Sequence, residues 1–217
     1  MNNIHEDLSW LPQPPQDFSQ RLHEVTNGND LRELAKFSLD ENHLRRLYKK
    51  TLALQNEHVD LLPLTAIKIG VISNATTKLA VPALVGTALR FGISLQVVEA
   101  EFNQIAQEAF SSDSAFIGQK LDFILVAIDY RGLPLSPCPG DEASAEKNVQ
   151  DCLGYVKSVL ESLRTKTGAQ IVLQNIASPV EALSGSYEGS LPGSATWLIS
   201  RLNSELDGLV ADDTFIL

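Results

Sequence analysis

Apolar residues follow two different periods along the chain, and the change between them lies near residue 66. Before it, apolar positions recur at the spacing of amphipathic helices. After it, short continuous apolar runs alternate with longer stretches of helical period, and the runs at 123–128 and 171–173 contain no polar residue. Such runs are typical of parallel strands that are buried on both faces. The second pattern therefore predicts a parallel sheet with helices on both of its faces.

Strands and helices are predicted in alternation after this change of pattern. We expect strands at 66–72, 94–99, 122–128, 169–176 and 213–217, and helices at 78–91, 102–110, 143–166 and 193–209. The predicted fold class is α/β, a doubly wound five-stranded parallel sheet preceded by an N-terminal helical arm. A doubly wound domain rarely stops directly after a strand, so we expect this chain to be part of a longer protein.

Residues 1–60 are predicted to form this N-terminal arm with its docking helices, and residues 61–217 the α/β domain. The segment 9–18 contains three prolines and is expected to be extended. Its apolar side chains are expected to pack on an apolar surface rather than to be free. They are Trp10, Leu11 and Phe18.

Two helices are predicted after the arm, because a reciprocal N-cap signature occurs twice. Asp30 is followed three residues later by Glu33, and Ser38 is followed by Glu41 in the same way. We interpret the second helix as a docking helix with one apolar face and with basic residues on its other faces. The apolar residues are Leu44, Leu47, Tyr48 and Leu52, and the basic residues are Arg45, Arg46, Lys49 and Lys50.

The formal net charge is −10 and the isoelectric point is about 4.8. Nucleic acids and anionic membranes need a basic footprint, so neither is an expected partner. No apolar run approaches the roughly 18 residues of a membrane span. The N-terminus has no signal-peptide pattern, so a cytoplasmic location is expected. Cys138 and Cys152 do not have metal or redox spacing, and Cys152 falls on an apolar helical stripe, which predicts a buried thiol.

The candidate binding site lies where the predicted strands end. Ligands of open α/β sheets bind at the carboxyl ends of the strands, and here the loops at that edge are 73–77, 99–104, 129–132 and 175–178. We expect the hydroxyl groups of the first loop to cap the helix near Lys78 and to hydrogen-bond a small-molecule ligand. Asp129 is expected to cap the following turn or to pair with Arg131. The candidate binding residues are Ser73, Asn74, Thr76, Thr77, Asp129 and Asn175.

Several kinds of chemistry lack the residues that they need. The loop after the first strand has no glycine, which excludes glycine-rich cradles for phosphates and dinucleotides. His and acidic residues have no zinc spacing, and Ser-Asn-Ala stands where a receiver-type magnesium site needs an acidic pair, so no metal and no cofactor are expected. All four histidines lie within the first 58 residues. No base is therefore predicted beside Ser73, Thr76 or Thr77, and hydrolase chemistry is not favoured.

A set of segments, taken in order along the chain, resembles the N-terminal region of FkbH-like proteins of the HAD superfamily (subfamily IIIC). The segments are 31–39, 44–47, the Ile-Ser-Asn-Ala-Thr-Thr run at 72–77, the Pro-Ala-Leu run at 82–84, 98–106, 174–179, 191–194 and 202–203. The resemblance implies a flavodoxin-like domain related to SGNH hydrolases, normally followed by a HAD-type phosphatase-like domain. It also implies a role in loading a glyceryl unit onto an acyl carrier protein in polyketide, nonribosomal-peptide or polysaccharide biosynthesis.

This chain departs from the SGNH pattern that the resemblance implies. SGNH enzymes have Gly-Asp-Ser after the first strand, and the matching positions are Ser73, Asn74 and Ala75, so alanine stands where the nucleophile would be. Residues 99–101 and Asp129 stand in the places of the family's glycine and asparagine. The aspartate-x-aspartate-x-threonine motif of the HAD domain does not occur in the chain.

Three functions stay open from the sequence. The favoured one is an accessory, non-catalytic SGNH-like domain that docks an acyl carrier protein or a partner HAD-like domain. In so acidic a chain this docking needs a local basic patch, for which the basic residues of the docking helix are the candidates. The second is an active SGNH-type esterase or acyltransferase that uses Ser73 or Thr76 with a base from outside this chain. The third is a structural oligomerisation domain whose helical arm wraps a neighbour.

Overall fold

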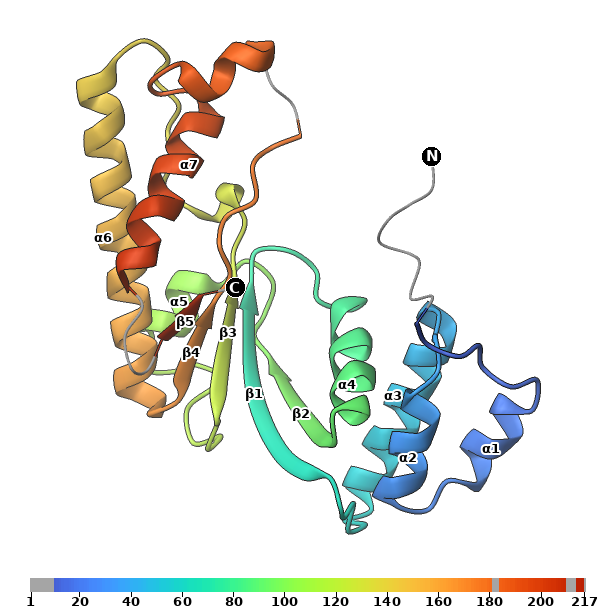
Figure 1. The fold of residues 1–217 in the computed structure, drawn as a ribbon. Helices are drawn as coiled ribbons and strands as arrows, with labels where there is room; N and C mark the ends of the chain where they lie inside the picture. The colour runs from blue at the N-terminus through green and yellow to red at the C-terminus, as the bar shows by residue number, and fades with distance from the viewer. Residues whose placement is uncertain (1–9, 181–183, 210–213, 217) are drawn as a thin grey trace. The chain divides into compact units, whose positions relative to one another are not determined.

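The computed structural model describes residues 10–180, 184–209 and 214–216 (Figure 1). Contacts divide the chain into two compact units. The first consists of Met1–Ile67 and Thr77–Gln96, and the second of Lys68–Thr76 and Val97–Leu217. The chain therefore leaves the first unit, returns to it and leaves it again.

The helices of the first unit, among its described residues, are α1 (Phe18–Glu24), α2 (Gly28–Ala35), α3 (Glu41–Asn56) and α4 (Ala80–Arg90). α4 contacts both α2 and α3. It does so because Val81, Val85 and Leu89 recur at intervals of four residues and form one buried face. The core of this unit includes Phe18, Leu22, Leu31, Leu34, Leu47 and Leu89.

Two of these helices begin at residues other than the predicted ones. α2 begins at Gly28, where the Asn27 side chain accepts a hydrogen bond from the Asp30 amide at 3.0 Å. Asp30 is thus not the cap but its reciprocal partner, since its carboxylate accepts from Asn27 Nδ2 at 2.8 Å. α1 was not predicted, and its N-cap residue, Asp17, makes no side-chain cap hydrogen bond.

The predicted start of α3 at Ser38 is also wrong, because the Ser38 amide donates to the Pro12 carbonyl of the arm at 2.8 Å. Asp40 caps α3 instead, and its carboxylate accepts from the His43 amide at 2.8 Å. The backbone hydrogen bond from His43 is the largest influence on this carboxyl group. It lowers the pKa of Asp40, which fits an anion at a helix N-terminus.

The arm packs as expected at two of its three apolar residues. Leu11 and Phe18 are buried, whereas Trp10 is exposed and lies under the Arg90 guanidinium, 5.7 Å from its ring centroid. Arg90 also donates to the Ala35 carbonyl at 2.9 Å, which ties α4 to the end of α2. Burial lowers the pKa of Arg90.

The strands are β1 (Thr65–Ser73), β2 (Ile93–Glu99), β3 (Phe123–Ala127), β4 (Gln170–Leu173) and β5 (Thr214–Ile216). Their order in the sheet is β2-β1-β3-β4-β5. β3 pairs in parallel with β1 and β4, and β4 pairs in parallel with β5. The predicted parallel sheet is thus confirmed for β1, β3, β4 and β5. For β2, and for the doubly wound arrangement, it stays a prediction. Residues 213 and 217 of the last predicted strand lie outside the described part of the chain.

The helices of the second unit are α5 (Ile105–Phe110), α6 (Glu142–Thr167) and α7 (Ala195–Leu206), all close to their predicted positions. α6 contacts both α5 and α7, and Figure 1 shows α6 and α7 running side by side. α6 begins at the Asp141 cap and ends at Gly168, whose φ of 69° favours glycine. Cys152 is fully buried on its inner face, as predicted, and burial raises the pKa of the thiol to about 12. Among the described helices, none is long and apolar enough to cross a membrane.

Candidate functional site

Asn74 and Asp129 form a mutual hydrogen-bonded pair at the carboxyl end of the sheet. Asn74 directly follows β1, and Asp129 follows β3, whose Ala127 is in register with Ser73. Asn74 Nδ2 donates to Asp129 Oδ1 at 2.6 Å, and the Asp129 amide donates to Asn74 Oδ1 at 2.9 Å. The structure thus brings two of the predicted binding residues together, and their polar groups are largely engaged with each other.

Asp129 both caps the turn that follows it and pairs with Arg131, the two roles that the sequence predicts as alternatives. Its Oδ1 accepts from the Arg131 amide at 2.8 Å and so caps the 3-10 turn η1 (Tyr130–Gly132). Its Oδ2 lies 3.6 Å from Arg131 Nη1. Burial raises the pKa of Asp129, but the hydrogen bonds from Asn74 and from the Arg131 amide, together with the Arg131 charge, outweigh it and hold the pKa below its usual value. Asp129 is therefore an ionised and weak base near neutral pH.

Gly132 allows η1 to approach Asn74 closely. A Cβ atom at this position would lie 2.8 Å from Asn74 Cγ and 2.8 Å from Ile128 Cγ2, closer than a side chain permits. The glycine therefore places the turn over the Asn74–Asp129 pair. No spacing rule in the sequence signals this requirement.

The hydroxyl residues of the first loop lie in different surroundings. Ser73 is buried, and its Oγ accepts from the Ala75 amide at 3.0 Å. Thr76 is exposed. α4 begins after Leu79, which makes no side-chain cap hydrogen bond, and the Thr77 carbonyl accepts from the Val81 amide at 2.9 Å. The Thr77 backbone thus closes this turn, and the hydroxyl cap near Lys78 stays a prediction.

Asn175 is exposed, and a different asparagine fixes the loop after β4. Asn203 of α7 accepts from the Ile176 amide and donates to the Ile176 carbonyl, both at 2.8 Å. This two-sided clamp takes Ile176 out of the sheet, which is why β4 ends at Leu173 and not at the predicted residue 176. Asn203 was missed as a site residue, although residues 202–203 belong to the segments that carry the family resemblance.

The four histidines are His5, His23, His43 and His58, so the sequence of the second unit contains none. Nδ1 of the His43 ring lies 2.7 Å from Asp40 Oδ1, so this ring nitrogen already has a hydrogen-bond partner. Within the described ranges, no three His, Cys, Asp or Glu side chains come together in a way that could hold a metal ion. Ser73 therefore has no histidine base within its own unit.

A basic groove lies between α1 and α3 in the first unit. Its lining is Ser19, Leu22, His23, Arg46, Lys49 and Lys50, and its volume is about 350 Å³. Arg46 donates to Ser19 Oγ at 2.6 Å, and Lys50 Nζ donates to the His23 carbonyl at 3.1 Å. Arg45 lies outside this lining and pairs with Glu41 at 3.3 Å. The predicted basic set thus contributes three of its four residues to one groove.

Comparison with known proteins identifies the family. Residues 68–217 match the family described as "FkbH, N-terminal domain". The chain belongs to this family. The predicted FkbH-like membership is therefore confirmed, whereas the finer relation to SGNH hydrolases stays a prediction. No curated protein matches the chain.

The chain is also similar to a solved structure from Bacteroides fragilis. That structure is the N-terminal part of the protein BF1531, containing a phosphatase domain complexed with Mg. The similarity has a TM-score of 0.59 and 18% sequence identity, and it covers 88% of this chain and 45% of that one. At this identity the similarity shows the fold alone. The chain spans less than half the length of the structure that it matches.

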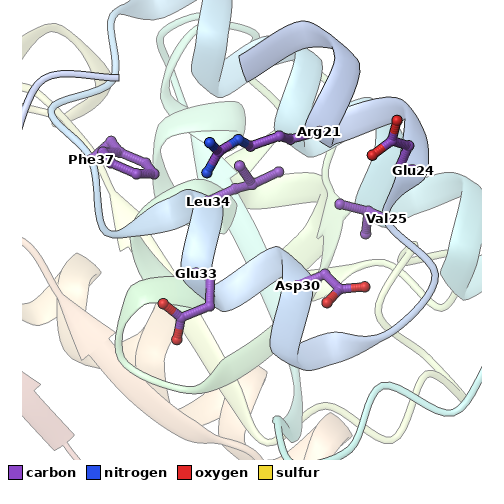
Figure 2. A pocket seen from close by; sticks show the side chains of 7 residues that line it. All are labelled: Arg21, Glu24, Val25, Asp30, Glu33, Leu34 and Phe37. Atoms are coloured by element: carbon purple, nitrogen blue, oxygen red, sulfur yellow. The ribbon is translucent and has the colours of Figure 1, made fainter. Parts of the chain in front are cut away.

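The FkbH N-terminal domain match begins at residue 68, so the hollows of α1–α3 lie outside it. The hollow in Figure 2 has a volume of about 410 Å³ between α1 and α2. Its carboxylates already have partners: Asp30 accepts from Asn27 Nδ2, Glu33 from Lys36 Nζ, and Glu24 from Gln20 Nε2. The charges around this hollow therefore serve the helices, and their negative excess disfavours an anionic ligand. Its lining is Arg21, Glu24, Val25, Asp30, Glu33, Leu34 and Phe37.

Proposed function

We propose that this chain is an accessory, non-catalytic domain of an FkbH-like protein, with an SGNH-like α/β unit that works beside a HAD-type phosphatase-like domain. Its role would be in loading a glyceryl-type unit onto an acyl carrier protein in natural-product or polysaccharide biosynthesis. The family match supports this, as does the phosphatase domain named in the B. fragilis structure. The observation that carries the non-catalytic part is the Asn74–Asp129 pair at the edge where a nucleophile and its base would meet.

The residues at this edge lack the parts of an activated nucleophile. A serine or threonine hydroxyl needs an adjacent base to attack a carbonyl group. Ser73 Oγ instead accepts a hydrogen bond from Ala75, the residue that stands in the nucleophile position of the SGNH pattern. Asp129, the carboxylate that pairs with Asn74 at this edge, has a lowered pKa, which makes it a poor proton acceptor. The edge is therefore suited to structure or binding rather than to acyl transfer.

A fluorophosphonate probe tests the non-catalytic proposal. We expect no labelling of the chain above the level of a Ser73→Ala variant, because no base raises the nucleophilicity of the hydroxyl. An active serine hydrolase in the same sample serves as the positive control. The reaction is run with and without an added HAD-type partner domain, because the esterase alternative requires a base from outside this chain. Labelling of Ser73 or Thr76 in either sample would contradict the proposal and would favour the esterase alternative.

Docking to an acidic carrier is assigned in this proposal to the basic groove between α1 and α3. Arg46, Lys49 and Lys50 line it together with His23, and its lining contains no carboxylate. In a chain of net charge −10, such a local excess of positive charge can steer an acidic partner to one face. The same groove would also suit an acidic face of a partner domain.

Charge reversal at the groove tests this docking. We expect the triple variant Arg46→Glu, Lys49→Glu, Lys50→Glu to weaken binding of a phosphopantetheinylated acyl carrier protein by about tenfold or more at low salt, because complementary charge is replaced by repulsion. Binding is measured by calorimetry or biolayer interferometry at two salt concentrations.

A matched pair of single variants separates docking from damage to the fold. Lys49→Glu is compared with Lys157→Glu, since both are exposed helical lysines and both change the net charge by the same amount. Lys49→Glu should weaken carrier binding, and Lys157→Glu of α6 should not. Equal effects of the two variants, or unchanged binding by the triple variant, would lead us to abandon this docking surface.

A further inference from the structure

A small apolar pocket lies in the second unit between the segment that follows η1 and the first two turns of α7. Its volume is about 210 Å³, and its lining includes Tyr130 and Arg131, whose side chain is largely exposed. We propose that this pocket binds a small organic anion with a short apolar chain, with the Arg131 guanidinium holding the anionic group. The inference does not depend on the proposed docking function. The apolar lining is formed by Leu133, Leu135, Pro137, Ala195, Leu198 and Ile199.

The walls of this pocket are fixed from both sides. On the outer segment, the Ser136 amide donates to Asn148 Oδ1 at 3.3 Å, and Asn148 Nδ2 donates to the Ser136 carbonyl at 3.0 Å. Further along, the Cys138 amide donates to the Gly193 carbonyl at 2.8 Å, just before α7 begins. These bonds hold the outer wall on α6 and on the N-terminal end of α7. A pocket whose walls are held in this way is pre-formed, which reduces the entropy lost on binding.

The interior of the pocket is poorly suited to water. Leu133, Leu198 and Ile199 are buried, and their side chains offer no hydrogen bond. Water in such a space lacks the polar partners that an ordered water molecule needs, so its displacement by an apolar chain is favourable. The pocket has a volume of about 210 Å³. This is below the range of about 300–1,000 Å³ that is usual for drug-sized ligands, so a short chain is indicated.

Arg131 supplies the charge that selects an anion. Its guanidinium carbon lies 4.8 Å from the centroid of the Tyr130 ring, and its Nη1 lies 3.6 Å from Asp129 Oδ2. The ring and the carboxylate hold the side chain at the rim, yet the long ion pair leaves donor capacity on a group that has five N–H bonds. A carboxylate or phosphate fits this planar fork in a bidentate manner. The pocket also borders the N-terminal turn of α7, whose dipole adds positive potential.

An NMR titration of the whole chain tests the pocket, with hexanoate, hexyl phosphate and 1-hexanol as probes. We expect hexanoate or hexyl phosphate to shift the amide signals of Leu133, Ala195 and Leu198, and the tighter of the two identifies the head group. 1-Hexanol has the same chain without charge and should bind at least about tenfold more weakly, a difference of about 1.4 kcal/mol. Absence of shifts at these amides with all three probes would overturn the pocket as a binding site.

Two variants and a control separate the charge from the cavity. Arg131→Gln should weaken binding of the anionic probe by about tenfold and leave the affinity for 1-hexanol unchanged. Ala195→Leu should fill the cavity and abolish binding of both kinds of probe. Lys157→Gln removes one exposed positive charge elsewhere in the unit and should change neither affinity. Unchanged anion binding by Arg131→Gln, or equal affinity of the native chain for hexanoate and 1-hexanol, would overturn the assignment of an anionic ligand.

Discussion

Replacement of Gly193 by alanine is expected to destabilise the second unit by about 2–5 kcal/mol, the sum of backbone strain and a steric clash. Gly193 has a φ of 80°, which an alanine adopts only with strain. A Cβ atom there would also lie 2.1 Å from the Cys138 carbonyl oxygen and 2.6 Å from the carbonyl carbon. Both are backbone atoms, so the Cys138 segment would have to move and lose its hydrogen bond to the Gly193 carbonyl.

Gly140→Ala is the matched control for this variant. Gly140 has a similar φ of 88°, belongs to the same pair of segments and has open space where a Cβ atom would lie. It reports the cost of the positive φ without the clash, so it should destabilise by about 1 kcal/mol. Urea unfolding measures both, with Trp197 fluorescence as the reporter after Trp10→Phe. Equal losses for the two variants would show that the contact with Cys138 has no energetic weight.

Replacement of Asn203 by alanine is expected to cost about 2–4 kcal/mol, because it leaves two backbone groups of a buried residue without their partner. Ile176 is 4% exposed, and both its amide and its carbonyl are bound by the Asn203 side chain. The loss should be accompanied by faster amide hydrogen exchange at Ile176, since local opening of this loop becomes easier.

Ser204→Ala is the control for Asn203→Ala, since Ser204 is the exposed neighbour on α7 and bonds only within its own helix, to the Ser200 carbonyl. Alanine is a better helix former than serine, so its effect should stay within about 0.5 kcal/mol. The same tryptophan reporter serves for both variants. A loss below about 1 kcal/mol for Asn203→Ala would mean that water replaces the clamp at little cost.

The strands and long helices of the second unit could be predicted because their apolar patterns are local. β3 is a continuous apolar run, and the inner face of α6 repeats with helical period. The end of β4 could not be predicted in this way. Gln174 still donates to the Val126 carbonyl, but Ile176 is drawn away by a side chain 27 residues later. Sequence pattern carries no information about such a distant competitor.

The predicted starts of α2 and α3 in the first unit are wrong for a related reason. Asp30 and Ser38 both carry the chemistry of a cap, but so do Asn27 and Asp40 nearby. Which residue caps depends on where the chain turns, and the turn before α3 is set by the contact between Ser38 and Pro12 of the arm. The prolines predict an extended arm, but they do not predict that its Pro12 carbonyl binds the Ser38 amide.

The candidate site was predicted residue by residue but not as an arrangement. Parallel strands place Asn74 and Asp129 at the same edge, so their proximity follows from the fold class. Their two hydrogen bonds do not follow from it, and neither does the close approach that Gly132 permits. The sequence predicts Arg131 as a partner for Asp129. It does not predict the apolar pocket beside Arg131, because α7, which is far away in sequence, forms part of the lining of this pocket.

The path of the chain between the two units bears on how such proteins can be divided and recombined. The family match begins at residue 68, within β1, while α4 of the first unit lies inside the matched range and packs on α2 and α3 outside it. A fragment cut at that boundary would keep α4 and lose the helices that cover Val81, Val85 and Leu89. Its newly bare apolar stripe would promote aggregation. A chimera of two related proteins should therefore take the N-terminal helices and the sheet from the same parent.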